Sequence, residues 1–261
     1  MELLEQMHMT DLLVVYLQWR LRYVRKAIRA VKIESTASTD PRWQSLSTEI
    51  AAFLQKVKNG EDLTPHLSRK ARYRGFTPGA SKSGTIANSW ADKDFLLNVM
   101  GLHHFHLGMT IEKAGHVTPT DDVLFASVSR DVFEVIGIFN HEVFENDDPN
   151  AMTTERKRLW EIYEARQNRG ALPGSLVIGG FGGMGISSSG HPLAVVRAAI
   201  SYRRIIMKID TQLDDLSFLQ KIFTPDPVPK NPKFLWTLNC LDLHVIEKTS
   251  KKPFLFQKGP N

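Results

Sequence analysis

The segment GLHHFHLG at residues 101–108 places three of the nine histidines of the chain within four residues, between two glycines. An imidazole titrates near neutral pH and can act as an acid, a base or a metal ligand. Because side chains alternate between the faces of a strand, His104 and His106 would share one face, about 7 Å apart, with His103 on the other. Two histidines on one face can transfer protons around a phosphate or bind a metal ion.

His141 ends a later β-like segment and is the fourth candidate. An antiparallel meander of the β-like segments would bring it near the strand that carries His104 and His106. We therefore predict these three residues as catalytic: His104 or His106 would deprotonate the 2′-hydroxyl of RNA, and His141 would protonate the leaving oxygen. The alternative is that the histidines only hydrogen-bond to neighbours in a half-buried sheet.

A metal site built on the same histidines is a second alternative. His-x-His would need a further ligand, and Asp121 and Asp122 could supply oxygens, although aspartate at such a place is also typical of turns. The sequence contains no HExxH motif, no CxxC pair and no EF-hand loop. A metal site on these histidines therefore remains an alternative, and no cofactor is predicted.

A glycine-rich segment, GGFGGMGISSSGH, occupies residues 179–191. A strand followed by a glycine turn and a helix N-terminus forms an anion site, so this segment could bind a phosphate through backbone N–H groups. It contains a match to GxGxxG, but the surrounding βαβ pattern of a dinucleotide domain is missing. The alternative is a plain connector. The predicted substrate-binding residues here are Gly182, Gly183, Gly185, Ser187 and His191.

Basic and aromatic residues alternate in a polar segment at residues 68–90. Arg72 and Arg74 are predicted to bind substrate phosphate, with Tyr73 and Phe76 available for base stacking. The alternative is a solvent-exposed loop anchored by the two rings.

The apolar periodicity predicts the elements that would position these residues. Helices are expected at 9–33, 42–58, 92–100, 152–169 and 192–219, and strands at 103–108, 123–129 and 132–141. Asn59-Gly60 is a typical helix end. Strand-like alternation also occurs at 235–247, whereas the last dozen residues are expected to be loosely ordered.

The predicted fold class is α+β, with N-terminal helices, a central antiparallel β-meander and a long C-terminal helix after a glycine-rich turn. The expected regions are an N-terminal helical region at 1–60, an α+β core at 61–225, and a C-terminal strand and tail at 226–261 that pack on the core.

The composition is that of an ordinary globular chain of 261 residues, 42% hydrophobic and 23% charged. The net charge of +5 permits contact with phosphate polymers, and the basic residues between 20 and 32 could form a contact surface. No stretch is apolar enough to span a membrane, the N-terminus lacks the features of a secretory signal, and Cys240 is the single cysteine. These features favour a cytoplasmic protein with no membrane partner.

Over roughly residues 70–205, the runs HHFHLG, VLFASVSRDVFEVIGIFNH and GGFGGMGISSSGH resemble a loose group of uncharacterised bacterial and prophage-associated proteins. In that group a GxHHxHLG run precedes two strands that end in histidine. A weaker similarity is to the β-meander of RelE-like RNase toxins, which use Arg, Lys and sometimes Tyr or His. This chain matches their strand rhythm but does not match those residues one by one.

The sequence therefore predicts a metal-independent ribonuclease of toxin or phage-defence type. RNA and a cognate inhibitor protein are its candidate partners. Two alternatives remain open: a non-catalytic module that binds nucleic acid or protein, and a metal-dependent hydrolase that uses the same histidines.

Overall fold

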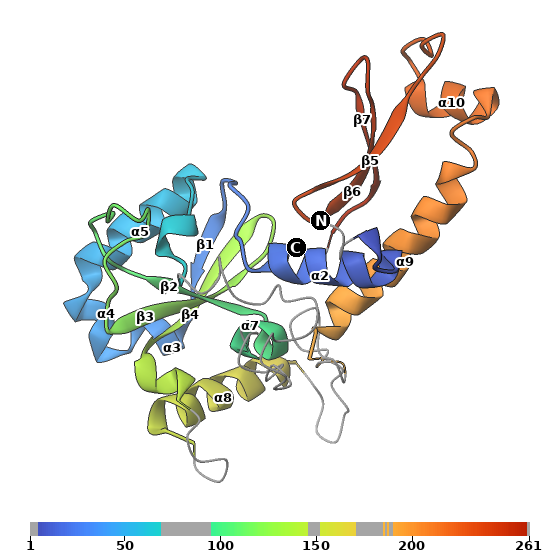
Figure 1. Cartoon of the computed structure of the whole chain (residues 1–261). Coiled ribbons are helices and arrows are strands. Elements are labelled where there is room, and N and C mark those ends of the chain that lie inside the picture. The colour runs from blue at the N-terminus through green and yellow to red at the C-terminus, as the bar shows by residue number, and fades with distance from the viewer. Residues whose placement is uncertain are drawn as a thin grey trace. The chain divides into compact units, whose positions relative to one another are not determined.

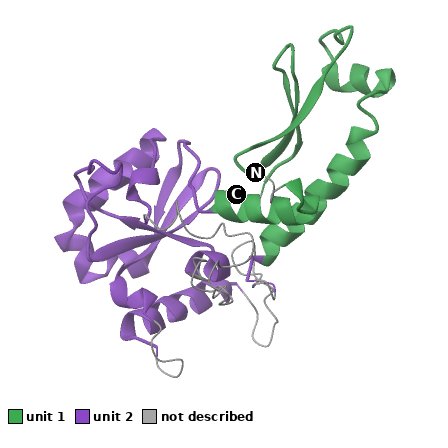
Figure 2. Ribbon diagram, in the orientation of Figure 1, with its two compact units in different colours: residues 1–21, 193–261 green, residues 22–192 purple. Residues whose placement is uncertain are grey.

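The computed structural model describes residues 5–68, 95–145, 152–170, 185, 187 and 190–259 (Figure 1). The chain forms two compact units (Figure 2). Unit 1 combines Met1–Leu21 with Leu193–Asn261, and unit 2 is Arg22–Pro192. The boundaries expected after residues 60 and 225 fall inside these units. Helices and strands occur in both, which confirms the α+β class.

Unit 2 is built on a four-stranded mixed sheet with the order β1-β4-β3-β2. Strands β2 (Leu102–His106), β3 (Asp122–Val128) and β4 (Val132–Asn140) are antiparallel, as expected for the meander. Strand β1 (Ala30–Ile33) adds to β4 in parallel. Residues 30–33 were expected to lie in a helix, and that prediction was wrong.

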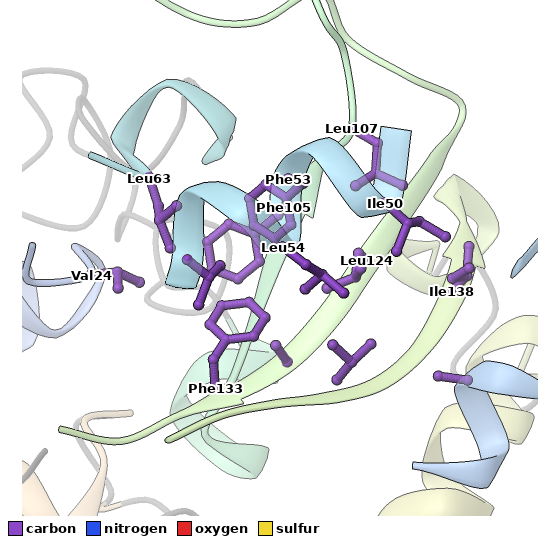
Figure 3. Close-up of a cluster of buried hydrophobic side chains, with 14 of the residues drawn as sticks. Val24, Ile50, Phe53, Leu54, Leu63, Phe105, Leu107, Leu124, Phe133 and Ile138 are labelled. Atoms are coloured by element: carbon purple, nitrogen blue, oxygen red, sulfur yellow. The ribbon is translucent and has the colours of Figure 1, made fainter. Parts of the chain in front are cut away.

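One face of this sheet is covered by α5 (Ser47–Asn59). Figure 3 shows the side chains that meet there, among them Phe53 and Leu54 of α5. Phe53, Phe105 and Phe133 form a group of three rings with centroids 5.2–5.8 Å apart. Helix α5 ends at Gly60, whose φ of 72° is a left-handed conformation that glycine adopts without strain. This end agrees with the sequence prediction.

The other face is covered by α7 (Phe95–Met100) and α8 (Thr154–Gln167). Leu96 and Leu159 belong to a buried cluster there with Phe125 and Phe139. The Thr153 side chain accepts a hydrogen bond from the backbone N–H of Arg156 and so caps the first turn of α8. Both faces of β3 and β4 are thus covered, and their central residues are buried.

Unit 1 contains α2 (Met9–Leu21), α9 (Leu193–Asp210) and α10 (Leu216–Phe223). Its antiparallel sheet has the order β5-β6-β7, with β5 (Phe234–Asn239), β6 (Asp242–Glu247) and β7 (Pro253–Gln257). The core is formed by buried residues of α2, α9 and β6, including Leu17, Val195 and Leu243. None of the helices in the described ranges is long and apolar enough to cross a membrane.

Two of the predicted helices differ from the structure in length or continuity. The helix at 9–33 ends at Leu21, and the basic stretch beyond it is not a helical face. Arg29 is buried there, and its guanidinium donates hydrogen bonds to backbone oxygens of Ser129 and Arg25. The expected helix at 192–219 divides into α9 and α10, because Asp215 caps a new helix.

Two further expectations were wrong in detail. The helix expected at 42–58 divides at Leu46 into α4 (Pro41–Ser45) and α5, and the short α3 (Ser35–Ser38) precedes them. The last residues, expected to be loosely ordered, include β7.

Candidate active site

The predicted catalytic histidines lie at β2 and directly after β4, two strands of unit 2 that are separated by β3. His104 and His106 are on β2, paired with Phe125 and Val123 of β3, and His141 begins the short helix η2 (His141–Phe144) directly after β4. His104 packs against the ring of Phe125, whereas the His103 ring stacks on Phe105. Phe125 and Phe105 belong to the clusters on opposite faces, so His104 and His106 share a face as predicted.

The structure brings His106 and His141 together. Their rings stack with centroids 5.7 Å apart and planes 26° apart. His106 at the end of β2 pairs with Val123 of β3, and Asn140 at the end of β4 pairs with Asp122 of β3. The ends of β2 and β4 therefore lie at the same edge of the sheet, on either side of β3.

The hydrogen-bond partners assign complementary tautomers to this pair. The Nδ1 atom of His141 lies 2.7 Å from the backbone oxygen of Asp121, which can only accept, so Nδ1 carries hydrogen and in the neutral ring Nε2 is an acceptor. The Nδ1 atom of His106 accepts from the backbone N–H of Thr120 at 3.3 Å, so in the neutral ring the proton is on Nε2. The exposed His141 therefore offers an acceptor, and the half-buried His106 offers a donor.

Burial, followed by the neighbouring charges of His104 and His141, lowers the pKa of His106 to about 4. His106 is therefore neutral near pH 7. Since its Nδ1 already accepts from Thr120 and its Nε2 carries hydrogen, His106 is not arranged to remove a proton from a substrate. This changes the role that the sequence analysis allowed for it.

A buried histidine outside this pair contacts the end of β2. His66, in η1 (Thr64–His66), places its Nδ1 atom 2.8 Å from the backbone oxygen of His106 and its Nε2 atom 3.0 Å from Nζ of Lys56. Because Lys56 donates to Nε2, Nδ1 donates to the His106 carbonyl. Burial lowers the pKa of His66, which favours this neutral form.

An aromatic side chain lies beside the pair. Phe144 of η2 is 37% exposed, and its ring centroid lies 4.8 Å from that of His104 and 5.8 Å from that of His141. It also stacks on Phe125. A partly exposed ring beside a proton-transfer group is a surface on which a nucleobase can stack.

A charged network, which the sequence analysis missed, supports the strand ends that carry the site. Glu155 of α8 accepts a hydrogen bond from the backbone N–H of Asn140 at 3.1 Å and from Arg42 at 3.0 Å. Arg42 also lies 3.6 Å from Asp122, and it shares Asp40 with Arg158. These residues come from segments near 40, 122, 140 and 155, which are far apart in the sequence, so no local pattern indicates that the segments meet.

The remaining predicted substrate-binding residues are not assembled with the histidines by any described contact. Arg72, Arg74, Gly182 and Gly183 lie outside the described residues.

The other three predicted substrate-binding residues, Gly185, Ser187 and His191, lie at the end of the glycine-rich segment. Gly185 has a φ of 77°, and the backbone N–H and hydroxyl of Ser187 both donate to the backbone oxygen of His191. The hydroxyl and N–H of Ser187 therefore close a turn at this point, instead of both being open to a ligand.

Within the residues that the structure describes, no group of three His, Cys, Asp or Glu side chains is arranged to hold a metal ion. Asp121 contributes its backbone oxygen to His141, and Asp122 lies near Arg42. A search of protein-family models, curated proteins and solved structures finds no match to this chain. Function is therefore inferred from the site alone.

Proposed function

We propose that this protein cleaves single-stranded RNA by proton transfer at His141, assisted by a hydrogen bond from His106. The observation that carries the proposal is the stacked pair, in which one Nε2 atom accepts and the other donates. A general base must have a free lone pair within reach of the substrate, and the exposed His141 has one.

In the proposed reaction the 2′-oxygen attacks phosphorus and the bond from phosphorus to the 5′-oxygen breaks. His141 Nε2 takes the proton of the 2′-hydroxyl, and the resulting imidazolium returns it to the 5′-oxygen. The products are a 2′,3′-cyclic phosphate and a 5′-hydroxyl. His106 donates its Nε2 hydrogen to a non-bridging oxygen, where negative charge develops. His141 thus takes the base role that the sequence analysis gave to His104 or His106 and keeps the acid role expected of it, while His106 stabilises charge.

Phe144 supports a single-stranded substrate, because a nucleobase can stack on it only when it is not paired in a duplex. The net charge of +5 supports a polyanionic substrate. A cytoplasmic toxin or phage-defence role, with a cognate inhibitor protein, is the biological setting we propose. One cysteine in the chain fits a reducing compartment.

The test uses the full chain with a short RNA in the presence of a chelator. We expect cyclic-phosphate products from the wild type and none from an oligonucleotide that carries 2′-O-methyl groups. His141→Asn keeps an N–H that can bond to the Asp121 oxygen but removes the base, so we expect cleavage to fall by about 10²-fold or more. His106→Phe keeps an aromatic ring at this position and removes the N–H donor, so we expect the cleavage rate to fall by about 10²-fold.

His244→Asn is the matched control, because His244 lies on β6 of unit 1 and its Nδ1 atom lies 3.1 Å from the backbone oxygen of Asp242. Induction of the wild type but not of His141→Asn should also arrest bacterial growth. Equal cleavage by wild type and His141→Asn would refute the proposal. Cleavage that a chelator abolishes would instead support the metal-dependent hydrolase.

A further inference from the structure

Helix α9 of unit 1 has an apolar face and a cationic face. The apolar face is buried: Val195, Ala199 and Tyr202 pack in the core with α2 and β6. The hydroxyl of Tyr202 donates to the backbone oxygen of Leu241 at 2.6 Å. The helix is therefore held in a fixed orientation relative to the rest of unit 1, and its other face is presented to solvent.

The solvent face of α9 is strongly basic. Its exposed cations are Arg197, Arg203, Arg204 and Lys208. The helix contains no acidic residue before Asp210. The Asp210 carboxylate accepts a hydrogen bond from the indole of Trp236 at 2.9 Å. We name the four cations the α9 cationic face.

Three of these cations form no ion pair with any residue that the structure describes. Arg203, Arg204 and Lys208 have no acidic partner within 4 Å anywhere in the described ranges. Surface arginines and lysines are commonly balanced by acids at helical spacing, which stabilises the helix. Here like charges adjoin one another instead, and their repulsion would be relieved by a bound polyanion.

The spacing suits a phosphate chain. Arg197, Arg204 and Lys208 recur at positions i, i+7 and i+11, which places them along one line of the helix. At a rise of 1.5 Å per residue this line is about 16 Å long. A nucleic-acid strand carries several phosphates over that length.

We propose that the α9 cationic face binds the phosphate backbone of single-stranded RNA. This surface lies in unit 1 and does not depend on the cleavage proposed for unit 2, since backbone binding requires no proton transfer. The contact surface expected from the sequence was the basic stretch at 20–32, and we assign that role to the α9 cationic face instead. The stretch at 20–32 is not a helical face, and Arg22 and Arg29 in it are buried.

An anionic membrane is the competing ligand. Ile200 and Met207 are exposed on the same side, at 39% and 57%. Helices that lie in a membrane interface bury a broad apolar face in the lipid. The apolar face of α9 is already buried in the protein core, so charge dominates what remains, and we favour nucleic acid.

The experiment measures binding of a fluorescent 2′-O-methyl RNA by anisotropy at a series of salt concentrations. This probe cannot be cleaved through its 2′-oxygen, so failure of the cleavage proposal does not affect the result. With about four phosphate contacts, log K should fall with log salt at a slope near −3. Arg204→Gln/Lys208→Gln should reduce that slope by about 1.4 and weaken binding ~10-fold or more at 0.1 M salt.

Lys248→Gln/Lys258→Gln is the matched control, because it removes the same charge from exposed positions around β6 and β7. We expect it to change affinity less than threefold. Thermal melts by circular dichroism would verify that both double variants fold. An equal effect of the two double variants, or none from the α9 variant, would overturn the proposal. The proposal would also be overturned if Arg204→Gln/Lys208→Gln lost binding to phosphatidylserine vesicles but kept RNA binding, because the α9 cationic face would then bind a membrane.

Discussion

Two buried histidines of unit 2 have opposite hydrogen-bond environments. His66 is 2% exposed, and both of its ring nitrogens are bonded, one to Lys56 and one to the His106 carbonyl. His116 is 4% exposed, and neither ring nitrogen has a hydrogen-bond partner within the described part of the chain. A buried polar atom without a partner loses its bonds to water and gains nothing in return.

This contrast predicts opposite effects of the same substitution. His116→Leu should leave the free energy of unfolding unchanged or raise it by about 1 kcal/mol, because it removes two unsatisfied atoms. His66→Leu should lower it by about 1–3 kcal/mol, because it leaves Lys56 and a backbone oxygen unsatisfied. Urea unfolding of both variants at pH 7 measures the difference. Equal destabilisation by the two substitutions would contradict this account.

At the scale of elements, the turn between β6 and β7 depends on one carboxylate. Glu247 accepts hydrogen bonds from the backbone N–H groups of Lys233, Thr249 and Ser250 and from the Ser250 hydroxyl. These bonds, with those from Ser250 the strongest, lower the pKa of Glu247 to about 2. The glutamate thus joins the start of β5 to the following hairpin.

The lowered pKa predicts a pH dependence with a definite sign. The ordinary pKa of a glutamate is about 4.5, so the folded state binds its proton less readily than the unfolded state. The stabilisation is complete above pH ~4.5 and is lost as the pH falls towards 2. We expect Glu247→Gln to be less stable than the wild type at pH 7 and to reduce the loss of stability between pH 5 and pH 3.

Denaturant midpoints across this range would measure the effect. Asp214→Asn, at an exposed position of unit 1, is the control and should retain the slope of the wild type. If Glu247→Gln left the pH dependence of stability unchanged, these hydrogen bonds would not be what lowers the pKa of the carboxylate.

The elements also show where sequence reasoning succeeds and fails. Strands β3 and β4 were found within one residue at each end, because buried β-branched and aromatic residues form a continuous pattern there. The apolar spacing continued past Leu21 through Val24, yet Val24 packs on the core of unit 2 from a non-helical segment. Strand β1 is mostly exposed and is defined only by pairing with β4, which no local pattern indicates.

At the scale of the whole molecule, the two units have separate cores. The clusters on the faces of the four-stranded sheet contain residues of unit 2, and the cluster of α2, α9 and β6 contains residues of unit 1. Unit 1 joins the two ends of the chain, so its stability depends on a helix that precedes unit 2 and on a sheet that follows it.

Truncation of the core of α2 should therefore loosen unit 1 selectively. Leu17 is fully buried, and Leu17→Ala should cost about 2–5 kcal/mol through the lost contacts and the cavity. We expect faster hydrogen exchange in α9, β5 and β6, with β3 and β4 still protected. Leu12→Ala on the same helix, at a site 37% exposed, should have little effect. Faster exchange throughout the chain would indicate a single cooperative unit instead.

The sequence by itself determined the α+β class, the central meander and the shared face of His104 and His106, because strand periodicity is a local property. Only the tertiary structure decided that His106 and His141 stack and which ring nitrogen of each is free. Burial and partners such as Thr120 and the Asp121 carbonyl set those states. Such partners are defined by how the strand ends fold back, and residue types and spacing do not encode that geometry.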